Sequence, residues 1–318
     1  MQHHLRGGIK MNLTGKHLID PSNFSLDELN QIFTVAQDME KNPIKYCDIC
    51  KGKILATLFF EPSTRTRLSF ESAMMRLGGN VLGFSDAASS STKKGESVMD
   101  TVRVVSGYSD IMVMRHPREG APKLSSSYST VPLINGGDGG HQHPTQTLTD
   151  LLTIKNLRGN ISNLKVALCG DLKYGRTVHS LIKTLARYPG MSFYLISPPQ
   201  LQLPIYIKEQ LKESYNIKIH ELTNIEDCIE EIDILYMTRI QKERFFNEED
   251  YLKLKNSYIL TQDKIENAKQ NLLIMHPLPR VNEISYEIDQ DPRAVYFEQA
   301  DYGVYVRMSL MAHLLGVL

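Results

Sequence analysis

The stretch from Ile54 to Gly79 constrains the fold more than any other part of the chain. It begins with an apolar run, Ile54 to Phe60, that has the length and composition of a buried parallel strand. Glu61-Pro62 interrupts that run, and a helical pattern follows that ends at Gly78-Gly79, as a glycine C-cap would end it. A strand that leads directly into a helix is the repeating unit of a parallel α/β fold.

The junction between that strand and that helix reads Ser63-Thr64-Arg65-Thr66-Arg67. Backbone N–H groups and the positive end of the helix dipole meet at such a junction. Because hydroxyls and guanidinium groups both donate hydrogen bonds to phosphate oxygens, the segment indicates an anion or phosphate site. The alternative is a capping box with solvent-facing arginines. The nucleotide-binding pattern G-x-x-x-x-G-K-[ST] is absent from the chain.

The rest of the sequence continues the alternation of strands and helices. Strands are expected at 54–60, 80–84, 110–114, 131–135, 165–169, 192–196, 217–220, 233–237, 272–275 and 294–297. Helices are expected at about 25–41, 63–77, 96–107, 143–156, 176–188, 205–214 and 301–315. Because 318 residues exceed a usual single core, the predicted fold is α/β with two domains, each a parallel sheet flanked by helices.

Charge and hydropathy limit the partners. The 36 Lys+Arg residues balance the 36 Asp+Glu residues, so no global field attracts nucleic acid or an acidic membrane, and an anion site must be local. No apolar run has the length of a membrane span, and no secretory h-region opens the chain, so we expect a cytoplasmic protein. Cys47 and Cys50 form a lone C-x-x-C, which fits ordinary reduced thiols better than a redox pair or half a zinc site.

Several polar residues follow expected strands or lie in the loops just after them, where ligands bind in open parallel sheets. They are Ser63, Arg115, His143, Gly170-Asp171, Arg239 and His276. One cleft between two domains would collect them. His143 also fits a helix-cap or core histidine, and a metal site with His141 lacks further ligands.

Seven motifs in register carry a family resemblance. They read FFEPSTRTRLSFE, SSSTKKGES, VMRHP, GDGGHQHPTQTLTDL, GDLKYGRTVHSL, LYMTRIQKER and MHPLPR. Together they resemble the catalytic chains of the aspartate carbamoyltransferase family, from about Met11 to the C-terminus. The resemblance implies transfer of the carbamoyl group from carbamoyl phosphate to the α-amine of L-aspartate, an early step of pyrimidine biosynthesis, with no metal and no organic cofactor.

The resemblance also implies a domain plan. Residues 1–145 would form a carbamoyl phosphate-binding domain and residues 146–299 an aspartate-binding domain, while a C-terminal helix at about 300–318 would pack back on the first. The active site would lie in the interdomain cleft and at a subunit interface.

Residue roles follow from the same resemblance. The catalytic set would be Arg65, Thr66, Lys94, Arg115 and His143. Carbamoyl phosphate would contact Ser63, Thr64, Arg65, Thr66, Arg115, His143 and Gln146, with Ser90 and Lys94 supplied by the adjacent subunit of a homotrimer. Aspartate would contact Lys94, Arg176, Arg239, Gln241, Pro277 and Leu278. Without the resemblance, the two arginines fit surface residues, and Lys94 fits a solvated loop.

Three other functions fit the sequence less well. Ornithine carbamoyltransferases typically carry His-Cys-Leu-Pro-Arg where this chain has His276-Pro277-Leu278-Pro279-Arg280, and Arg176 with Arg239 suits an anionic substrate better. A non-catalytic homologue is disfavoured because the phosphate motif, Lys94 and His143 are all present. A dehydrogenase is disfavoured because no strand leads into G-x-G-x-x-G. The sequence leaves open whether regulatory chains bind as partners.

Overall fold

The structure is a computed structural model that describes residues 11–86, 95–240, 249 and 258–318. The chain divides into two compact units. Unit 1 consists of Met1–His116, Ala121–Gly136 and Val304–Leu318, and unit 2 of Pro117–Gly120 and Gly137–Gly303.

Unit 1 is built on a four-stranded sheet. In the order β2-β1-β3-β4, its strands are Asn80–Phe84, Ile54–Phe59, Ile111–His116 and Leu133–Asp138. The central strand β1 runs parallel to both β2 and β3. Five of its six residues are buried, as expected for a strand whose two faces are both covered.

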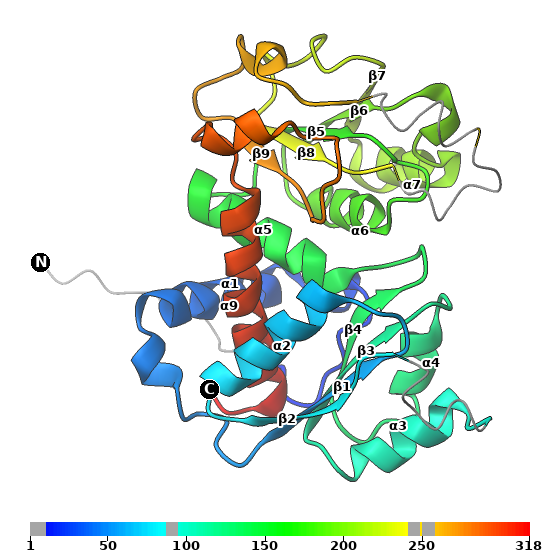
Figure 1. The fold of residues 1–318 in the computed structure, drawn as a ribbon, viewed down its shortest axis with the longest axis vertical. Helices are drawn as coiled ribbons and strands as arrows, with labels where there is room; N and C mark the ends of the chain where they lie inside the picture. Colours follow the sequence, from blue (N-terminus) through cyan, green and yellow to red (C-terminus); the bar gives the residue numbers. More distant parts are fainter. Residues whose placement is uncertain (1–10, 87–94, 241–248, 250–257) are drawn as a thin grey trace, which may run out of the picture. The chain divides into compact units, whose positions relative to one another are not determined.

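Helices cover both faces of this sheet. They are α1 (Leu26–Lys41), α2 (Thr64–Arg76), α3 (Val98–Ser106) and α4 (Ala121–Ser126), with the C-terminal part of α9 (Tyr296–Leu315). Figure 1 shows α1, α2 and α9 on one face of the sheet, and α3 and α4 on the other. Two short 3-10 helices, Pro21–Asn23 and Pro43–Tyr46, flank α1. A hydrogen bond joins the C-terminal part of α9 to α1 within unit 1, since Ser309 Oγ donates to the Ile32 carbonyl at 2.7 Å.

Unit 2 is built on a five-stranded sheet. In the order β7-β6-β5-β8-β9, its strands are Lys218–Leu222, Ser192–Ile196, Lys165–Cys169, Ile234–Met237 and Leu273–Met275. Each adjacent pair is parallel. All the carboxyl ends therefore lie along one edge, with β5, β8 and β9 as consecutive neighbours.

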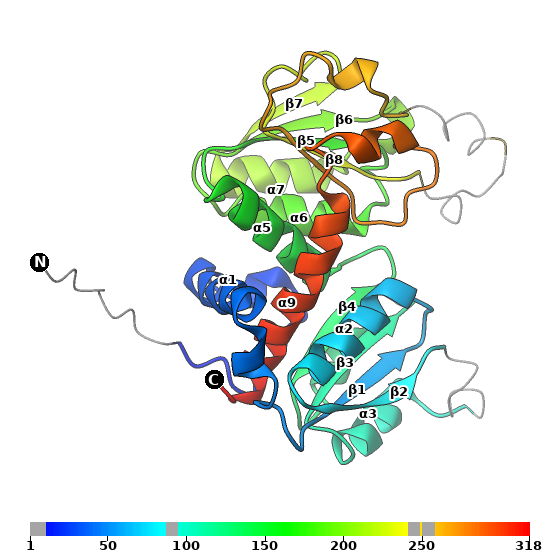
Figure 2. The ribbon, with the colours of Figure 1, turned by 60° about the vertical axis from the view of Figure 1, so that its left-hand side comes forward.

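Three α-helices lie along this sheet: α5 (Pro144–Arg158), α6 (Arg176–Leu185) and α7 (Ile205–Tyr215) (Figure 2). Short 3-10 helices at Pro199–Leu201, Asp263–Ile265 and Tyr286–Gln290 connect other elements. A core cluster forms around Ala167, Leu235 and Ile274 of β5, β8 and β9. Among its other members are Ile229, Ile265 and Ile288, which come from the connecting segments.

The predicted fold class, α/β with two parallel-sheet units and flanking helices, is confirmed. The helix α1 begins as its sequence predicts, since Ser25 Oγ accepts from Glu28 N at 3.1 Å and Glu28 accepts from Ser25 N at 2.8 Å. The domain boundary expected between residues 145 and 146 stays a prediction.

The strand expected at 294–297 is wrong. Ala294 forms only an isolated bridge to Ile274, and α9 begins at Tyr296 rather than at the expected Asp301. Val-Tyr-Phe favours a strand by propensity, but the fully buried Tyr296 is placed by packing in the core of unit 2.

The other differences concern element ends. β4 continues through Gly136 and Gly137 to Asp138, beyond the expected end at Asn135. A Cβ at Gly136 would lie 3.1 Å from Val113 Cγ2 of β3, so the glycine permits a close approach of the two strands. The helix α4 was not predicted, and α6 ends at Leu185 rather than at Tyr188.

In the part of the chain that the structure describes, no helix is both long and apolar enough to span a bilayer.

Candidate active site

The predicted phosphate motif lies where β1 leads into α2. Ser63 occupies the N-cap position, but its side chain makes no capping hydrogen bond. Thr64 and Arg65 are exposed, whereas Thr66 is buried. Arg67 is bound within the helix, since its Nε donates to Glu71 Oε1 at 2.7 Å. The local geometry therefore differs from a capping box, and it leaves the Ser63 hydroxyl uncommitted to the first turn of α2.

Arg115 lies beside this motif in unit 1. It is the partner of Phe59 in the β1–β3 register, and its carbonyl accepts from Phe60 N at 2.9 Å. Its guanidinium is largely buried, and Nη2 lies 2.9 Å from Glu61 Oε2. Two neighbouring parallel strands thus bring Arg115 and the Ser63–Arg67 segment to the same edge of the sheet.

His143 and Gln146 occupy the start of α5 in unit 2. His143 is the N-cap residue, it is 6% exposed, and its backbone N–H donates to Ser180 Oγ at 3.1 Å. Pro144 follows at the favoured first position of the helix. Gln146 is half-buried, and its Nε2 donates to Asp150 Oδ1 at 2.8 Å.

The two predicted carboxylate-binding arginines follow neighbouring strands of unit 2. Arg176 is the first residue of α6, reached from the end of β5, and its Nη1 donates to the Gly139 carbonyl. Arg239 comes two residues after the end of β8 and is half-buried. The ends of β5 and β8 are joined by a hydrogen bond of 3.1 Å from Asp171 N to Thr238 Oγ1.

The turn from His276 to Leu278 follows β9, the next strand along. Burial lowers the pKa of His276, which keeps its ring neutral, and Nδ1 accepts from Leu278 N at 2.8 Å. The ring proton therefore lies on Nε2, 2.8 Å from Glu283 Oε1. Leu278 adopts φ 53°, a conformation that non-glycine residues take up rarely.

Each unit thus collects a subset of the predicted residues. Unit 1 contains Ser63, Thr64, Arg65, Thr66 and Arg115. Unit 2 contains His143, Gln146, Arg176, Arg239, Pro277 and Leu278. Ser90, Lys94 and Gln241 lie outside the described residues.

Two residues absent from the sequence prediction support these side chains. Glu61 forms an ion pair with Arg115, and Asp150 accepts a hydrogen bond from Gln146. The spacing of four residues between Gln146 and Asp150 on one helix face could have indicated that contact. Nothing in the sequence indicates the pairing of Glu61 with a residue 54 positions later (115 − 61).

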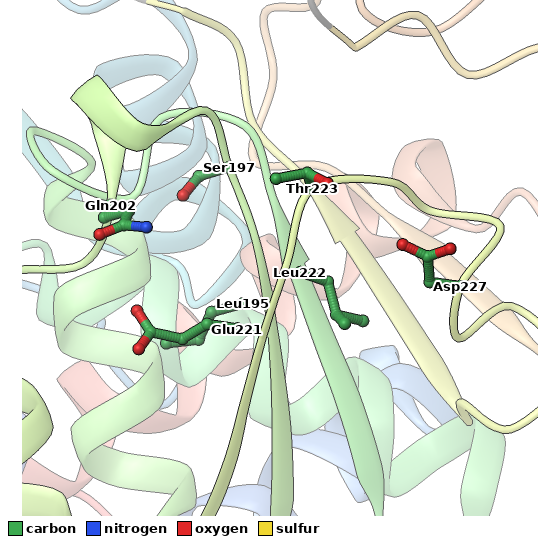
Figure 3. Close-up of a pocket in the computed structure, with 7 residues that line it drawn as sticks. All are labelled: Leu195, Ser197, Gln202, Glu221, Leu222, Thr223 and Asp227. Atoms are coloured by element: carbon green, nitrogen blue, oxygen red, sulfur yellow. The ribbon is translucent and has the colours of Figure 1, made fainter.

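A pocket of about 210 Å³ opens elsewhere along the edge of the unit 2 sheet, beside the ends of β6 and β7 (Figure 3). Its lining includes Glu221 and Asp227 but no lysine or arginine. Two carboxylates and no cation do not suit a phosphate or a dicarboxylate, so this pocket is not the predicted site.

The described residues contain no group of three or more His, Cys, Asp or Glu side chains placed to hold a metal ion. Of the C-x-x-C pair, Cys47 is exposed and Cys50 is buried. Burial raises the pKa of the Cys50 thiol to about 11, which disfavours the reactive thiolate.

Two family models match this chain, and the first of them covers His143 and Gln146 as well as the phosphate motif, although these two residues lie in unit 2 of the structure. The family model "aspartate/ornithine carbamoyltransferase, carbamoyl-P binding domain" matches residues 16–156, and the model of the family's "Asp/Orn binding domain" matches residues 162–314. The aspartate carbamoyltransferase catalytic subunit of Alkaliphilus metalliredigens is 66% identical over 97% of this chain and 99% of that protein. The corresponding subunit of Clostridium kluyveri is 62% identical over 96% of this chain and 99% of its own length.

Solved structures extend the likeness to the fold. The catalytic subunit of M. jannaschii aspartate transcarbamoylase is 50% identical, with a TM-score of 0.88 over 95% of this chain and 98% of that one. Aspartate transcarbamoylase from Trypanosoma cruzi in complex with carbamoyl phosphate is 38% identical, with a TM-score of 0.90 over 95% and 97% of the two chains. The resemblance inferred from the seven motifs is confirmed, and the chain belongs to the aspartate/ornithine carbamoyltransferase family.

Proposed function

We propose that this protein is an aspartate carbamoyltransferase that joins carbamoyl phosphate and L-aspartate to give N-carbamoyl-L-aspartate and phosphate. The observation that carries the proposal is the 66% identity, over almost the full length of both chains, to a protein of that name. Related structures from Trypanosoma cruzi were solved with carbamoyl phosphate and aspartate together, and with carbamoyl aspartate and phosphate.

In the proposed reaction, the α-amine of aspartate attacks the carbonyl carbon of carbamoyl phosphate. A tetrahedral intermediate forms, the carbon–oxygen bond to phosphate breaks, and the amine loses a proton. The departing phosphate is a suitable acceptor for that proton. Such a reaction depends on stabilising the oxyanion and the leaving phosphate, and we assign it no metal and no organic cofactor.

We assign the phosphate to the junction of β1 and α2, where Ser63, Thr64, Arg65 and Thr66 present hydroxyls, a guanidinium and a helix N-terminus. Thr66, Arg115 and His143 are assigned to the carbonyl oxygen. Gln146 is assigned to the carbamoyl amide.

We assign the two carboxylates of aspartate to Arg176 and Arg239, together with Gln241, because the fork of a guanidinium matches a carboxylate. Pro277 and Leu278 supply backbone carbonyls to the substrate amine. Ser90 and Lys94 complete the site from an adjacent subunit, so the working form is a homotrimer. We place it in the cytoplasm, at an early step of pyrimidine biosynthesis.

Product formation with two amines tests the proposal. The protein is incubated with carbamoyl phosphate and either L-aspartate or L-ornithine, and the products are identified by mass. We expect carbamoyl-aspartate and no citrulline. Citrulline alone would mean that the assignment of the arginines to an anionic substrate is wrong. Absence of both products from a folded trimer would favour a non-catalytic homologue.

A further inference from the structure

One carboxylate lies at the centre of a buried network in unit 2. Asp150 of α5 is 0% exposed. Its Oδ1 accepts from Gln146 Nε2 at 2.8 Å and from Gln299 Nε2 at 2.6 Å, and its Oδ2 accepts from the Tyr236 hydroxyl at 2.9 Å. These donors come from α5, α9 and β8, so elements distant in the sequence meet at this side chain.

The network decides which end of the Gln146 side chain meets Asp150. A glutamine amide has a donor end and an acceptor end of nearly the same shape. Because an ionised carboxylate only accepts hydrogen bonds, Gln146 must turn its NH₂ group toward Asp150. Its carbonyl oxygen is then the end directed away from Asp150.

A second branch runs from Asp150 to the turn after β9. Gln299 is 1% exposed, and its Oε1 accepts from His276 N at 3.0 Å while its Nε2 donates to Asp150. His276 in turn accepts from Leu278 N through Nδ1. The same carboxylate is therefore linked through Gln299 to the turn that holds Leu278 at φ 53°.

We propose that Asp150 is a positioning residue that fixes the Gln146 amide with its carbonyl oxygen toward the carbamoyl NH₂ group, and so selects a carbamoyl donor over an acyl donor. The inference rests on the proposed function. A carbamoyl group has two N–H donors where the acetyl group of acetyl phosphate has a methyl group. An outward carbonyl oxygen on Gln146 can bind the first but not the second, whereas an outward NH₂ group would face another donor.

A purely architectural role for Asp150 leads to a different expectation. If the buried carboxylate only joins α5 to β8 and α9, its replacement would lower the stability of the fold. The replacement would also weaken the binding of all ligands of the site alike. Orientation of Gln146 affects only a ligand that carries an NH₂ group. Discrimination between donors therefore separates the two roles.

The test replaces Asp150 with leucine, which is of similar size but has no atom that accepts a hydrogen bond from the NH₂ group of Gln146. Dissociation constants for carbamoyl phosphate, acetyl phosphate and inorganic phosphate are measured by titration calorimetry on the intact protein. We expect Asp150→Leu to weaken the binding of carbamoyl phosphate by about tenfold or more, because a hydrogen bond to its NH₂ group is lost. The dissociation constants of acetyl phosphate and inorganic phosphate should change by less than about twofold, since neither ligand carries an NH₂ group.

Tyr236→Phe is the matched control, because it removes a buried hydrogen bond to the same carboxylate without touching Gln146. It should lower thermal stability and leave the ratio of the carbamoyl phosphate and acetyl phosphate constants unchanged. Equal weakening of the binding of all three ligands in Asp150→Leu, or no weakening at all, would overturn the inference.

A double-mutant cycle with Gln146→Ala identifies the residue through which Asp150 acts. In the Gln146→Ala background, Asp150→Leu should leave the ratio of the two constants nearly unchanged, because the amide that Asp150 orients is gone. A full additional loss would contradict the inference. If Asp150→Leu does not fold, Asp150→Ala, whose side chain also accepts no hydrogen bond, is measured instead and should shift the ratio in the same direction.

Failure of the inference is distinguishable from failure of the proposed function. If the unchanged protein forms no carbamoyl-aspartate, the proposed function is wrong, and the inference that rests on it is withdrawn. If it forms carbamoyl-aspartate while Asp150→Leu keeps the wild-type discrimination, only the role of Asp150 is wrong.

Discussion

At the scale of single residues, two arginines on the first turn of α2 have different surroundings. Arg67 is bound to Glu71 four residues later, a contact that helix spacing alone provides. Arg65 is exposed at the N-terminal end of the same helix. Identical side chains two positions apart therefore divide between a helix-stabilising ion pair and an exposed position at the start of the helix.

We predict that Arg65→Ala lowers kcat/KM for carbamoyl phosphate by about 100-fold or more, since it removes a charge-assisted contact to the phosphate. Thermal stability should stay close to that of the unchanged protein, because the side chain is exposed. Arg76→Ala, at the exposed end of the same helix, is the control and should keep full activity. A near-normal rate for Arg65→Ala would contradict the assignment of the phosphate site.

A second residue-level prediction concerns acid stability. Asp291 accepts from Arg293 Nε at 2.8 Å and from Nη2 at 2.7 Å, and both side chains are largely buried. These hydrogen bonds hold the pKa of Asp291 well below its usual value. A carboxylate with a depressed pKa in the folded state adds stability that is complete above its unfolded pKa and is lost as the pH falls through its folded pKa.

Asp291→Asn should therefore lower the free energy of unfolding by about 1–3 kcal/mol at pH 7. The difference from the unchanged protein should persist down to about pH 4 and shrink below it, as the native Asp291 becomes protonated. Urea unfolding at a series of pH values measures this difference. Asp48→Asn, at an exposed position, is the control. A difference that grows on acidification would show that the sign is wrong.

At the scale of elements, the site depends on how helices begin and end. The helix α5 carries His143, Gln146 and Asp150, and it ends at Gly159, which has φ 79°. Its amide donates to the Lys155 carbonyl at 3.0 Å, as in a left-handed C-cap. The helix α3 ends at Gly107, whose φ is −78° and therefore suits any residue.

Gly159→Ala should lower the free energy of unfolding by about 1 kcal/mol, because a side chain is strained at positive φ even where space is open. Gly107→Ala is the matched change at another helix end and should be neutral or slightly stabilising. Chemical denaturation measures both. KM values should be unaffected in either variant, so a changed KM in Gly159→Ala would indicate that the C-cap also positions the start of α5.

At the scale of the whole molecule, the proposed trimer has a direct test. Lys94 is assigned to the site of the adjacent subunit, whereas Arg65 belongs to the site of its own chain. Inactive Lys94→Ala and inactive Arg65→Ala subunits, mixed and reassembled, should therefore regain part of the activity, because some interfaces contain both intact residues. Mixtures of each variant with itself are the controls. No recovery in hybrids verified by mass would contradict the shared site.

Much of this protein is readable from its sequence because the relevant forces are local. The apolar run before Ser63 and the position of Pro144 each set an element through neighbouring residues. Seven motifs spread along the chain also identify the family. The strand expected at 294–297 failed because packing of Tyr296 overrode its local propensity.

The sequence by itself determined the α/β class, the order of most elements and the residue types of the site, since periodicity and capping act over a few positions. Only the tertiary structure decided which side chains hold those residues in place. Glu61 meets Arg115 across two strands, and Asp150 meets Gln299 across 149 positions of the chain. Such contacts follow from how sheets and helices pack, and a buried polar group takes whichever partner that packing brings within reach.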